Sequence, residues 1–296
     1  MAKYPILTKK DVDKIISFKK INLNKKNNHK TPFPGHLSFL MSLDLGLTKE
    51  LIEIKTQEFV IIRNNKIFFE EFNKIKENTF YAIINNKLFA IELFSNETNL
   101  YYKLKPTNDW PSLMLSSVPM HRFKSSTPKI SAELMVKEIS PINGIVLDCC
   151  AGLGYTSVIE ANQPNCKEVI SFEKDNNVLE IASYNPYSND FFLNKKIKLY
   201  KESVFEGIKK FENNYFDRIL HDPPTVSFAK ELYSIHFYKE LYRVLKKEGL
   251  LYHYCPNPKK TKGNEFFKIV EKLLKQAGFI NVKYNPNSSG IRATKK

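Results

Sequence analysis

The sequence predicts an α/β fold in which a mostly parallel sheet follows a smaller mixed α/β domain. A glycine-containing turn at residues 148–156 stands between an apolar, strand-like run and a helix-compatible segment. Later strand-like runs end at Glu173, shortly before Glu202, and at Asp222. Because parallel strands end at one edge of an open α/β sheet, where ligands bind, we expect these acids and the turn to lie together.

Residues 1–120 form the predicted N-terminal domain, which we expect to recognise the substrate. Apolar periodicity predicts helices at residues 11–16, 35–41 and 47–52. The basic run at 19–30 is expected to be a solvated loop, with an RNA-contacting arm as the alternative.

From residue 58 onward the pattern changes to β-hairpins. Segments 59–69 and 81–91 each contain two strand-like runs around an asparagine pair, Asn64–Asn65 and Asn85–Asn86. With a third strand at 100–104, they predict a small sheet of three to five strands. Its aromatic residues alternate with polar ones, so we expect core packing, with stacking on bases as the alternative. These aromatic residues are Phe59, Phe68, Tyr81 and Tyr101.

Residues 121–296 form the second predicted domain, after a linker at residues 110–119. Thr127 and Pro128 predict the start of a helix, because threonine caps helices and proline fits their first position. Arg122 precedes this helix and is one of only five arginines in the chain. It is a candidate substrate residue, because the segment ahead of the first strand often covers the cofactor in such folds.

The turn itself predicts a site for a nucleotide-like cofactor. Gly152 and Gly154 allow backbone conformations that other residues avoid, and they let a ligand approach the main chain closely. A helix N-terminus beside the end of a parallel strand adds backbone N–H donors. Asp148, Cys150 and Tyr155 complete the candidate contacts of this loop. Cys150 is not a glycine, so its backbone is expected to avoid a positive φ.

Two acidic positions extend the predicted cofactor site. Glu173 follows a strand-like run and lies nineteen residues beyond Gly154. An acid at this spacing accepts hydrogen bonds from the ribose hydroxyls of an adenosine. After the next strand, at 197–200, Glu202 or Ser203 is expected to hold the adenine edge.

The fourth and fifth strands supply the candidate catalytic and substrate residues. Asp222, Pro223 and Pro224 follow the fourth strand, at 216–220. The prolines stiffen the loop and leave carbonyl groups free to accept hydrogen bonds. The candidate substrate residues are Thr225, after the prolines, and His253 and Tyr254, which end the fifth strand.

These features together resemble the class I S-adenosylmethionine-dependent methyltransferases. The turn has their D-x-x-x-G-x-G pattern, and Thr156 comes two residues after Gly154 without the third glycine of an NAD-binding loop. The resemblance covers residues 125–296 and is closer still to a group of archaeal predicted methyltransferases, sometimes labelled spermine synthase-like. It implies a Rossmann-like sheet of seven strands and S-adenosyl-L-methionine as the cofactor. The segments that carry the closer match are 148–156, 173–175, 185–188, 221–224, 232–234 and 237–243.

The resemblance also implies a role for the loop at Asp222. Methyl transfer from a sulfonium is an in-line displacement, so alignment and desolvation matter more than acid–base chemistry. In related enzymes with a D/N-P-P-aromatic motif, the side chain and a carbonyl hold an exocyclic amine. Here Thr225 replaces the aromatic residue, so stacking of a flipped adenine is not expected at this position. Because Thr225 is not a cysteine, the covalent route to 5-methylcytosine is not expected either.

The leading hypothesis is methyl transfer from S-adenosylmethionine to a nitrogen atom, with RNA as the preferred substrate class. One alternative is aminopropyl transfer to a polyamine from the decarboxylated cofactor. It needs several carboxylates around the acceptor, whereas Asp222 is the only obvious acid around its motif. Two further alternatives are methylation of a protein or a small molecule and a cofactor-binding module without catalysis.

Composition supports an RNA partner only mildly. The net charge is +15, but 41 of the 46 basic residues are lysines, whereas phosphate sites often use the bidentate guanidinium of arginine. The four cysteines show no metal-ligand spacing and are expected to be reduced, so no metal is predicted. Without a run of eighteen apolar residues or a signal-peptide core, we expect a soluble, cytoplasmic protein without a membrane partner. The oligomeric state is not predicted.

Overall fold

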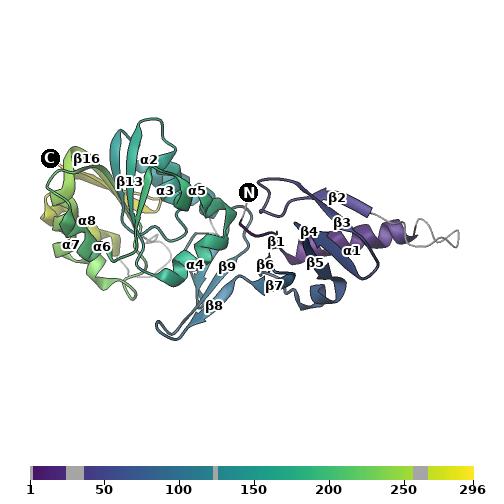
Figure 1. The fold of residues 1–296 in the computed structure, drawn as a ribbon. Coiled ribbons are helices and arrows are strands. Elements are labelled where there is room, and N and C mark those ends of the chain that lie inside the picture. Colours follow the sequence, from purple (N-terminus) through teal and green to yellow (C-terminus); the bar gives the residue numbers. More distant parts are fainter. Residues whose placement is uncertain (1–2, 25–36, 123–125, 256–265) are drawn as a thin grey trace. The chain divides into compact units, whose positions relative to one another are not determined.

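The computed structural model describes residues 3–24, 37–122, 126–255 and 266–296 (Figure 1). The chain forms two compact units. The first comprises Met1–Val118 and Ser183–Pro186, and the second comprises Pro119–Ala182 and Tyr187–Lys296. No helix within the described ranges has the length and apolar character needed to span a bilayer.

The first unit combines a long helix with small antiparallel sheets. Its helical segments are α1 (Lys9–Asn24) and a 3-10 helix at Phe69–Lys74. The sheets are ordered β1-β6-β7, β2-β3-β4-β5 and β11-β10-β9-β8. The strands are β1 (Ile6–Leu7), β2 (Leu37–Met41), β3 (Glu50–Ile54), β4 (Phe59–Ile62), β5 (Asn65–Phe68), β6 (Tyr81–Ile84), β7 (Lys87–Ala90), β8 (Glu92–Ser95), β9 (Leu100–Lys105), β10 (Ser112–Leu115) and β11 (Val118–Pro119).

Several sequence-based expectations for this unit are wrong. The segments predicted as helices at 35–41 and 47–52 contain strands β2 and β3, because they bury alternate residues against the core shared with α1. The predicted linker at 110–119 contains β10, which pairs with β9. The predicted loop at 19–30 begins inside α1, and residues 25–36 lie outside the described residues.

Both predicted hairpins are confirmed, β4–β5 and β6–β7, but the single small sheet expected from them is wrong, because the two hairpins and β9 belong to three different sheets. The first hairpin turns at Arg63 and Asn64, one residue earlier than expected, and the second at Asn85 and Asn86. All four residues have positive φ, as two-residue turns of type I′ require, and asparagine tolerates this conformation well. The Asn86 side chain accepts a hydrogen bond from the Lys66 N–H at 2.8 Å, which joins the two hairpins.

The second unit contains the predicted seven-stranded Rossmann-like sheet. Its order is β14-β13-β12-β15-β16-β18-β17. The first five strands are parallel, and β18 runs antiparallel to both β16 and β17. The strands are β12 (Gly144–Asp148), β13 (Cys166–Phe172), β14 (Ile197–Tyr200), β15 (Phe216–His221), β16 (Leu245–Tyr254), β17 (Ile280–Asn285) and β18 (Gly290–Thr294). The order reverses between β12 and β15, which is where open sheets of this kind bind ligands.

Helices cover both faces of this sheet (Figure 1). On one face, Val158 and Phe191 pack with Ala151 and Leu179 into a small cluster. On the other face, a larger apolar core includes residues of β12, β15 and the last two long helices. The helices are α2 (Pro128–Glu138), α3 (Tyr155–Ala161), α4 (Asn176–Tyr184), α5 (Asn189–Leu193), α6 (Val204–Gly207), α7 (Ile235–Val244) and α8 (Phe266–Ala277), with 3-10 segments at Pro186–Ser188, Ile208–Lys210 and Lys230–Tyr233.

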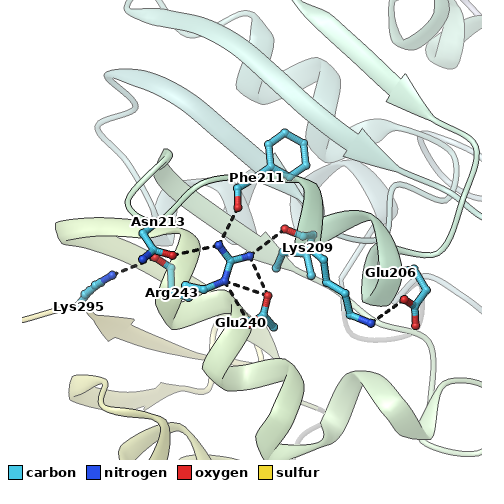
Figure 2. Close-up of polar contacts among 8 residues, drawn as sticks. Glu206, Lys209, Phe211, Asn213, Glu240, Arg243 and Lys295 are labelled. Carbon is cyan, nitrogen blue, oxygen red and sulfur yellow. Dashed lines mark hydrogen bonds and ion pairs between the residues drawn. The ribbon is translucent and has the colours of Figure 1, made fainter.

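Arg243 forms a hydrogen-bond network near the N-terminal ends of β15 and β16 (Figure 2). Its guanidinium donates hydrogen bonds to the Phe211 carbonyl at 2.7 Å, to Asn213 at 3.1 Å and to the Glu240 carboxylate at 2.8 Å. Lys295 donates to the Arg243 carbonyl at 3.2 Å. This network joins α7 to the loop before β15, and it lies at the opposite ends of these strands from Asp222.

Candidate active site

The loop after β12 has the conformation that its glycines permit. Gly152 and Gly154 adopt φ values of 54° and 77°, whereas Cys150 avoids a positive φ, as expected. A Cβ on Gly154 would lie 2.2 Å from Cγ of Phe191, but a Cβ on Gly152 would meet no atom within 4 Å. Gly154 is therefore required for packing, whereas Gly152 leaves open space above the loop.

Asp148, the last residue of β12, stabilises this loop through hydrogen bonds to the start of α3. Its side chain is fully buried, and its carboxylate accepts hydrogen bonds from Thr156 at 2.7 Å and Ser157 at 2.6 Å. Burial raises the pKa of Asp148 despite these bonds. The structure therefore places this predicted cofactor residue beneath the loop, where it ties the end of β12 to the start of α3.

Glu173 lies directly beyond β13, and the backbone fixes its carboxylate. One oxygen accepts a hydrogen bond from the Gly152 N–H at 3.0 Å, and the other accepts one from the Asp175 N–H at 2.9 Å. A carboxylate has about four acceptor positions, so two of them stay available to a ligand. Burial raises the pKa of Glu173 to about 7, although the two N–H donors oppose this increase.

Glu202 and Ser203 follow β14, at the same edge of the sheet. Glu202 is half-buried and forms an ion pair with Lys210, 2.5 Å away. The Ser203 hydroxyl caps the short helix α6 by accepting a hydrogen bond from the Phe205 N–H at 3.3 Å. Both side chains therefore have partners within the protein, and both keep some exposed surface.

A pocket with a cavity volume of about 60 Å³ brings several of the predicted residues together. Cys150, Glu173, Glu202, Ser203 and Pro224 all line it. The residues that sequence reasoning did not assign to it are Cys149, Phe172, Lys174, Val204, Ala229, Glu231 and Leu232. Ala229, Glu231 and Leu232 lie shortly after the Asp222 motif in the sequence, and this position was a usable signal.

Asp222 lies next to this pocket, at the end of β15. It is half-buried, and burial raises its pKa to about 7, with a further contribution from the negative charge of Asp148. Its charge also acts on Cys150, which lines the pocket. A carboxylate with a pKa near neutrality is suited to accept a proton at physiological pH.

The carbonyl groups of the two prolines are less available than expected. The Tyr233 hydroxyl donates a hydrogen bond to the Pro224 carbonyl at 2.9 Å and lies 3.4 Å from the Pro223 carbonyl. This contact fixes the loop to the 3-10 segment at Lys230–Tyr233. Thr225 is exposed and pairs with Ser227 at 2.9 Å.

His253 and Tyr254 differ in their access to a ligand. His253 has no exposed surface, and its ring nitrogens are 2.9 Å from the Tyr238 hydroxyl and 2.7 Å from the Tyr254 carbonyl. It also packs against the His221 ring, 4.5 Å away. We therefore place His253 in the packing beneath the site, in contrast to the substrate contact expected from the sequence. Tyr254 is half-buried and close enough to Asp222 for that charge to raise its pKa.

Arg122 and Tyr155 complete the predicted set. Tyr155 is nearly fully buried, and its ring lies 5.3 Å from that of His121. Arg122 is half-buried and donates a hydrogen bond to the Asn287 carbonyl at 3.1 Å. The segment 121–122 therefore connects the start of α3 with the turn between β17 and β18.

Comparison with known proteins agrees with this architecture. A family model described as conserved hypothetical protein 95 matches residues 133–284, about half of the chain. An uncharacterized protein of Methanocaldococcus jannaschii is 43% identical over 199 residues, which cover 67% of this chain and 68% of that protein. The chain belongs to the conserved hypothetical protein 95 family.

Several solved structures are similar to this chain in fold. Spermidine synthase from Thermotoga maritima is 14% identical with a TM-score of 0.54, and the match covers 93% of this chain and 84% of that chain. A spermidine synthase in complex with the transition state analogue AdoDATO is 14% identical with a TM-score of 0.52, and the match again covers 93% of this chain and 84% of that chain. MNMC2 from Aquifex aeolicus is 18% identical with a TM-score of 0.47, over 66% and 70% of the two chains. With the strand order above, the likeness to the two spermidine synthase structures identifies a class I methyltransferase-like fold.

Proposed function

We propose that the protein transfers a methyl group from S-adenosyl-L-methionine to a nitrogen atom, with RNA as the substrate class. The observation that carries this proposal is the placement of Glu173 and Asp222. Glu173 follows β13 and Asp222 follows β15 at one edge of the sheet, beside a pocket that Cys150, Glu173 and Pro224 line.

The residues of the pocket fit the adenosine part of this cofactor. The Glu173 carboxylate is fixed by two backbone N–H groups and retains acceptor capacity for ribose hydroxyls. Glu202 and Ser203 supply polar contacts for the adenine edge, and Phe172 and Leu232 supply apolar walls. When bound, S-adenosyl-L-methionine supplies an electrophilic methyl group.

Asp222 is the residue proposed to act on the acceptor. Its carboxylate is adjacent to the pocket and titrates at about pH 7, so it can orient an N–H group and accept its proton. Tyr233 fixes the following loop, which keeps Asp222 in position. Thr225 offers no flat ring, which favours an acceptor that is not held by stacking at this point.

The first unit supports the choice of RNA. On β4 and β5, Phe59 and Phe68 face each other across the sheet, and Phe68 is 39% exposed. The Lys66 ammonium lies 4.1 Å from the Phe59 ring and 4.8 Å from the Phe68 ring. Exposed rings beside a cation are typical of surfaces that bind single-stranded nucleic acids. Tyr81, in contrast, is buried, as core packing predicts.

The net charge is +15, but several of the arginine side chains already have partners within the protein. The guanidinium of Arg63 pairs with Glu50, and that of Arg243 is used within the second unit (Figure 2). Arg218 donates to the backbone carbonyls of Ile139 and Pro141. A contact with RNA would therefore depend mainly on lysines and aromatic rings.

Label transfer from methyl-tritiated S-adenosylmethionine tests both parts of the proposal. The acceptor source is a lysate of cells that lack this gene, and the Asp222→Asn variant is the control. We expect the wild-type protein to produce label that nuclease removes. Protease-sensitive or filterable label would overturn RNA as the substrate class but keep methyl transfer. No label, together with tighter binding of the decarboxylated cofactor, would replace methyl transfer by aminopropyl transfer.

A further inference from the structure

Arg122 differs from the other half-buried arginines in the partners of its guanidinium. Arg63, Arg218 and Arg243 each donate to a carboxylate or to at least two backbone carbonyls. Within the described residues, Arg122 donates a single hydrogen bond, from Nη1 to the Asn287 carbonyl, and has no carboxylate partner. Among the described residues, most of its five N–H donors therefore have no partner.

The strand register places Arg122 at the edge of the sheet that holds the candidate active site. His221 pairs with His253, so Asp222 lies beside Tyr254 at the ends of β15 and β16. Tyr254 in turn pairs with Gly290, which follows the β17–β18 turn. Because Arg122 is attached to this turn through Asn287, it lies near the end of β16.

Electrostatic effects agree with this placement. Burial raises the pKa of Tyr254 to about 12, Asp222 adds to the increase, and the positive charge of Arg122 opposes it. Burial also raises the pKa of Tyr284, and Arg122 again acts in the opposite direction. The charge of Arg122 thus acts on two tyrosine hydroxyls, and the charge of Asp222 acts on one of them.

A half-buried guanidinium that lacks a counter-ion favours the binding of an anion. It has lost part of its hydration, and a carboxylate or a phosphate group would restore hydrogen bonds in the bidentate geometry that arginine prefers. Asp222 and Asp148 do not fill this role, because neither forms an ion pair with Arg122 in the described residues.

We propose that Arg122 binds a carboxylate or phosphate group of a bound ligand at the end of β16. This inference rests on the proposed function, because the anion has two chemical sources in that reaction. The first is the carboxylate of the cofactor's methionine part, in which case Arg122 selects S-adenosylmethionine against its decarboxylated form. The second is an anionic group of the acceptor.

Calorimetric titration of wild-type, Arg122→Gln and Arg122→Lys proteins tests the proposal. The probes are S-adenosylhomocysteine, 5′-methylthioadenosine, which lacks the carboxylate, and inorganic phosphate. The matched control is Arg292→Gln, which removes one positive charge from an exposed position of β18. Thermal unfolding of each variant verifies that it is folded.

If the anion belongs to the cofactor, Arg122→Gln weakens S-adenosylhomocysteine binding at least about tenfold and leaves methylthioadenosine unchanged, since a hydrogen bond to a charged group is lost. If it belongs to the acceptor, both nucleosides bind unchanged, and phosphate binds the wild-type protein but not Arg122→Gln. In either case Arg122→Lys recovers part of the affinity. The proposal is overturned if Arg122→Gln binds all three probes like the wild-type protein and Arg292→Gln. Failure of the wild-type protein to bind either nucleoside would overturn the proposed function instead, and the phosphate titration would still test Arg122.

Discussion

The Glu173 carboxylate accepts a hydrogen bond from the backbone N–H of Gly152 at 3.0 Å. This contact joins the end of β13 to the glycine loop that follows β12, so two parts of the proposed cofactor site hold each other in place. A ligand that bonds to Glu173 therefore contacts a carboxylate whose position the backbone has already fixed. Such pre-organisation reduces the entropy lost on binding.

Replacement of Glu173 by glutamine should weaken cofactor binding. The glutamine side chain has no charge. Its NH₂ group is a donor, so it cannot accept a hydrogen bond from the backbone N–H that one carboxylate oxygen of Glu173 binds. We expect the Kd for S-adenosylhomocysteine to rise at least about tenfold, the loss typical of a charged hydrogen bond. Calorimetry measures the change, and Glu231→Gln is the control because Glu231 lines the same pocket but pairs with Lys174. Equal effects of the two substitutions would contradict a specific role for Glu173.

The two glycines of the loop should respond differently to alanine. Gly154→Ala places a Cβ 2.2 Å from Phe191 in a positive-φ conformation, so we expect a loss of about 2–5 kcal/mol in the free energy of unfolding. Gly152→Ala meets no neighbouring atom and should lose about 1–2 kcal/mol from its positive φ alone.

Cofactor binding separates these two variants further. The Cβ of Gly152→Ala would project into the open space above the loop. We therefore expect this variant to be more stable to unfolding than Gly154→Ala but to bind S-adenosylhomocysteine poorly. Urea unfolding and calorimetry measure the two properties. Normal binding by Gly152→Ala would show that the cofactor does not approach this part of the loop.

Removal of the Tyr233 hydroxyl should disturb the loop that carries Asp222. In Tyr233→Phe the Pro224 carbonyl loses its donor at 2.9 Å, and we expect a loss of about 1 kcal/mol in stability. The larger effect should be a lower kcat with little change in cofactor affinity, because the loop is less well positioned. Tyr242→Phe is a suitable control, since the Tyr242 ring packs against Phe279 away from the Asp222 loop. A kcat equal to that of the wild-type protein would contradict this role.

Stability should depend on pH through Asp222. Its pKa is raised from 3.8 to about 7 in the folded protein, so folding favours the protonated form, and its contribution to stability declines as the pH rises from about 4 to 7. Asp222→Asn removes this decline. We expect the variant to be more stable than the wild-type protein by about 1–4 kcal/mol at pH 8 and nearly equal to it below pH 4. Urea unfolding at pH 4, 6 and 8 measures the difference, and a pH-independent difference would contradict the raised pKa.

The part of the fold that could be predicted from the sequence is the part with strong local signals. The run from Asp148 to Gly154 is a turn whose glycines must adopt positive φ, and Glu173 follows a buried strand at a spacing set by one βα unit. These signals depend on short-range geometry, so they located the glycine loop, the acid after β13 and the motif after β15 without knowledge of tertiary contacts.

The remaining features depend on tertiary contacts. The apolar residues of β2 and β3 fit both the helical and the strand period over a few positions, and packing against α1 decides between the two structures. His253 ends a strand near the site, but its burial beside Tyr238 and His221 follows from the packing of α7, which no local pattern reveals. The contact of Tyr233 with Pro224 joins residues nine positions apart through an irregular loop.

The most direct test of the central proposal is the rate of methyl transfer by wild-type and Asp222→Asn proteins between pH 6 and 8. Methyl-tritiated S-adenosylmethionine is the donor, and the nuclease-sensitive fraction of the lysate is the acceptor. If Asp222 accepts the proton, the wild-type rate rises with pH around a midpoint near 7, and the variant is slower by about 100-fold or more at pH 8 with unchanged cofactor binding. A variant that transfers label at the wild-type rate, with the same pH profile, would contradict the proposed role of Asp222 in methyl transfer.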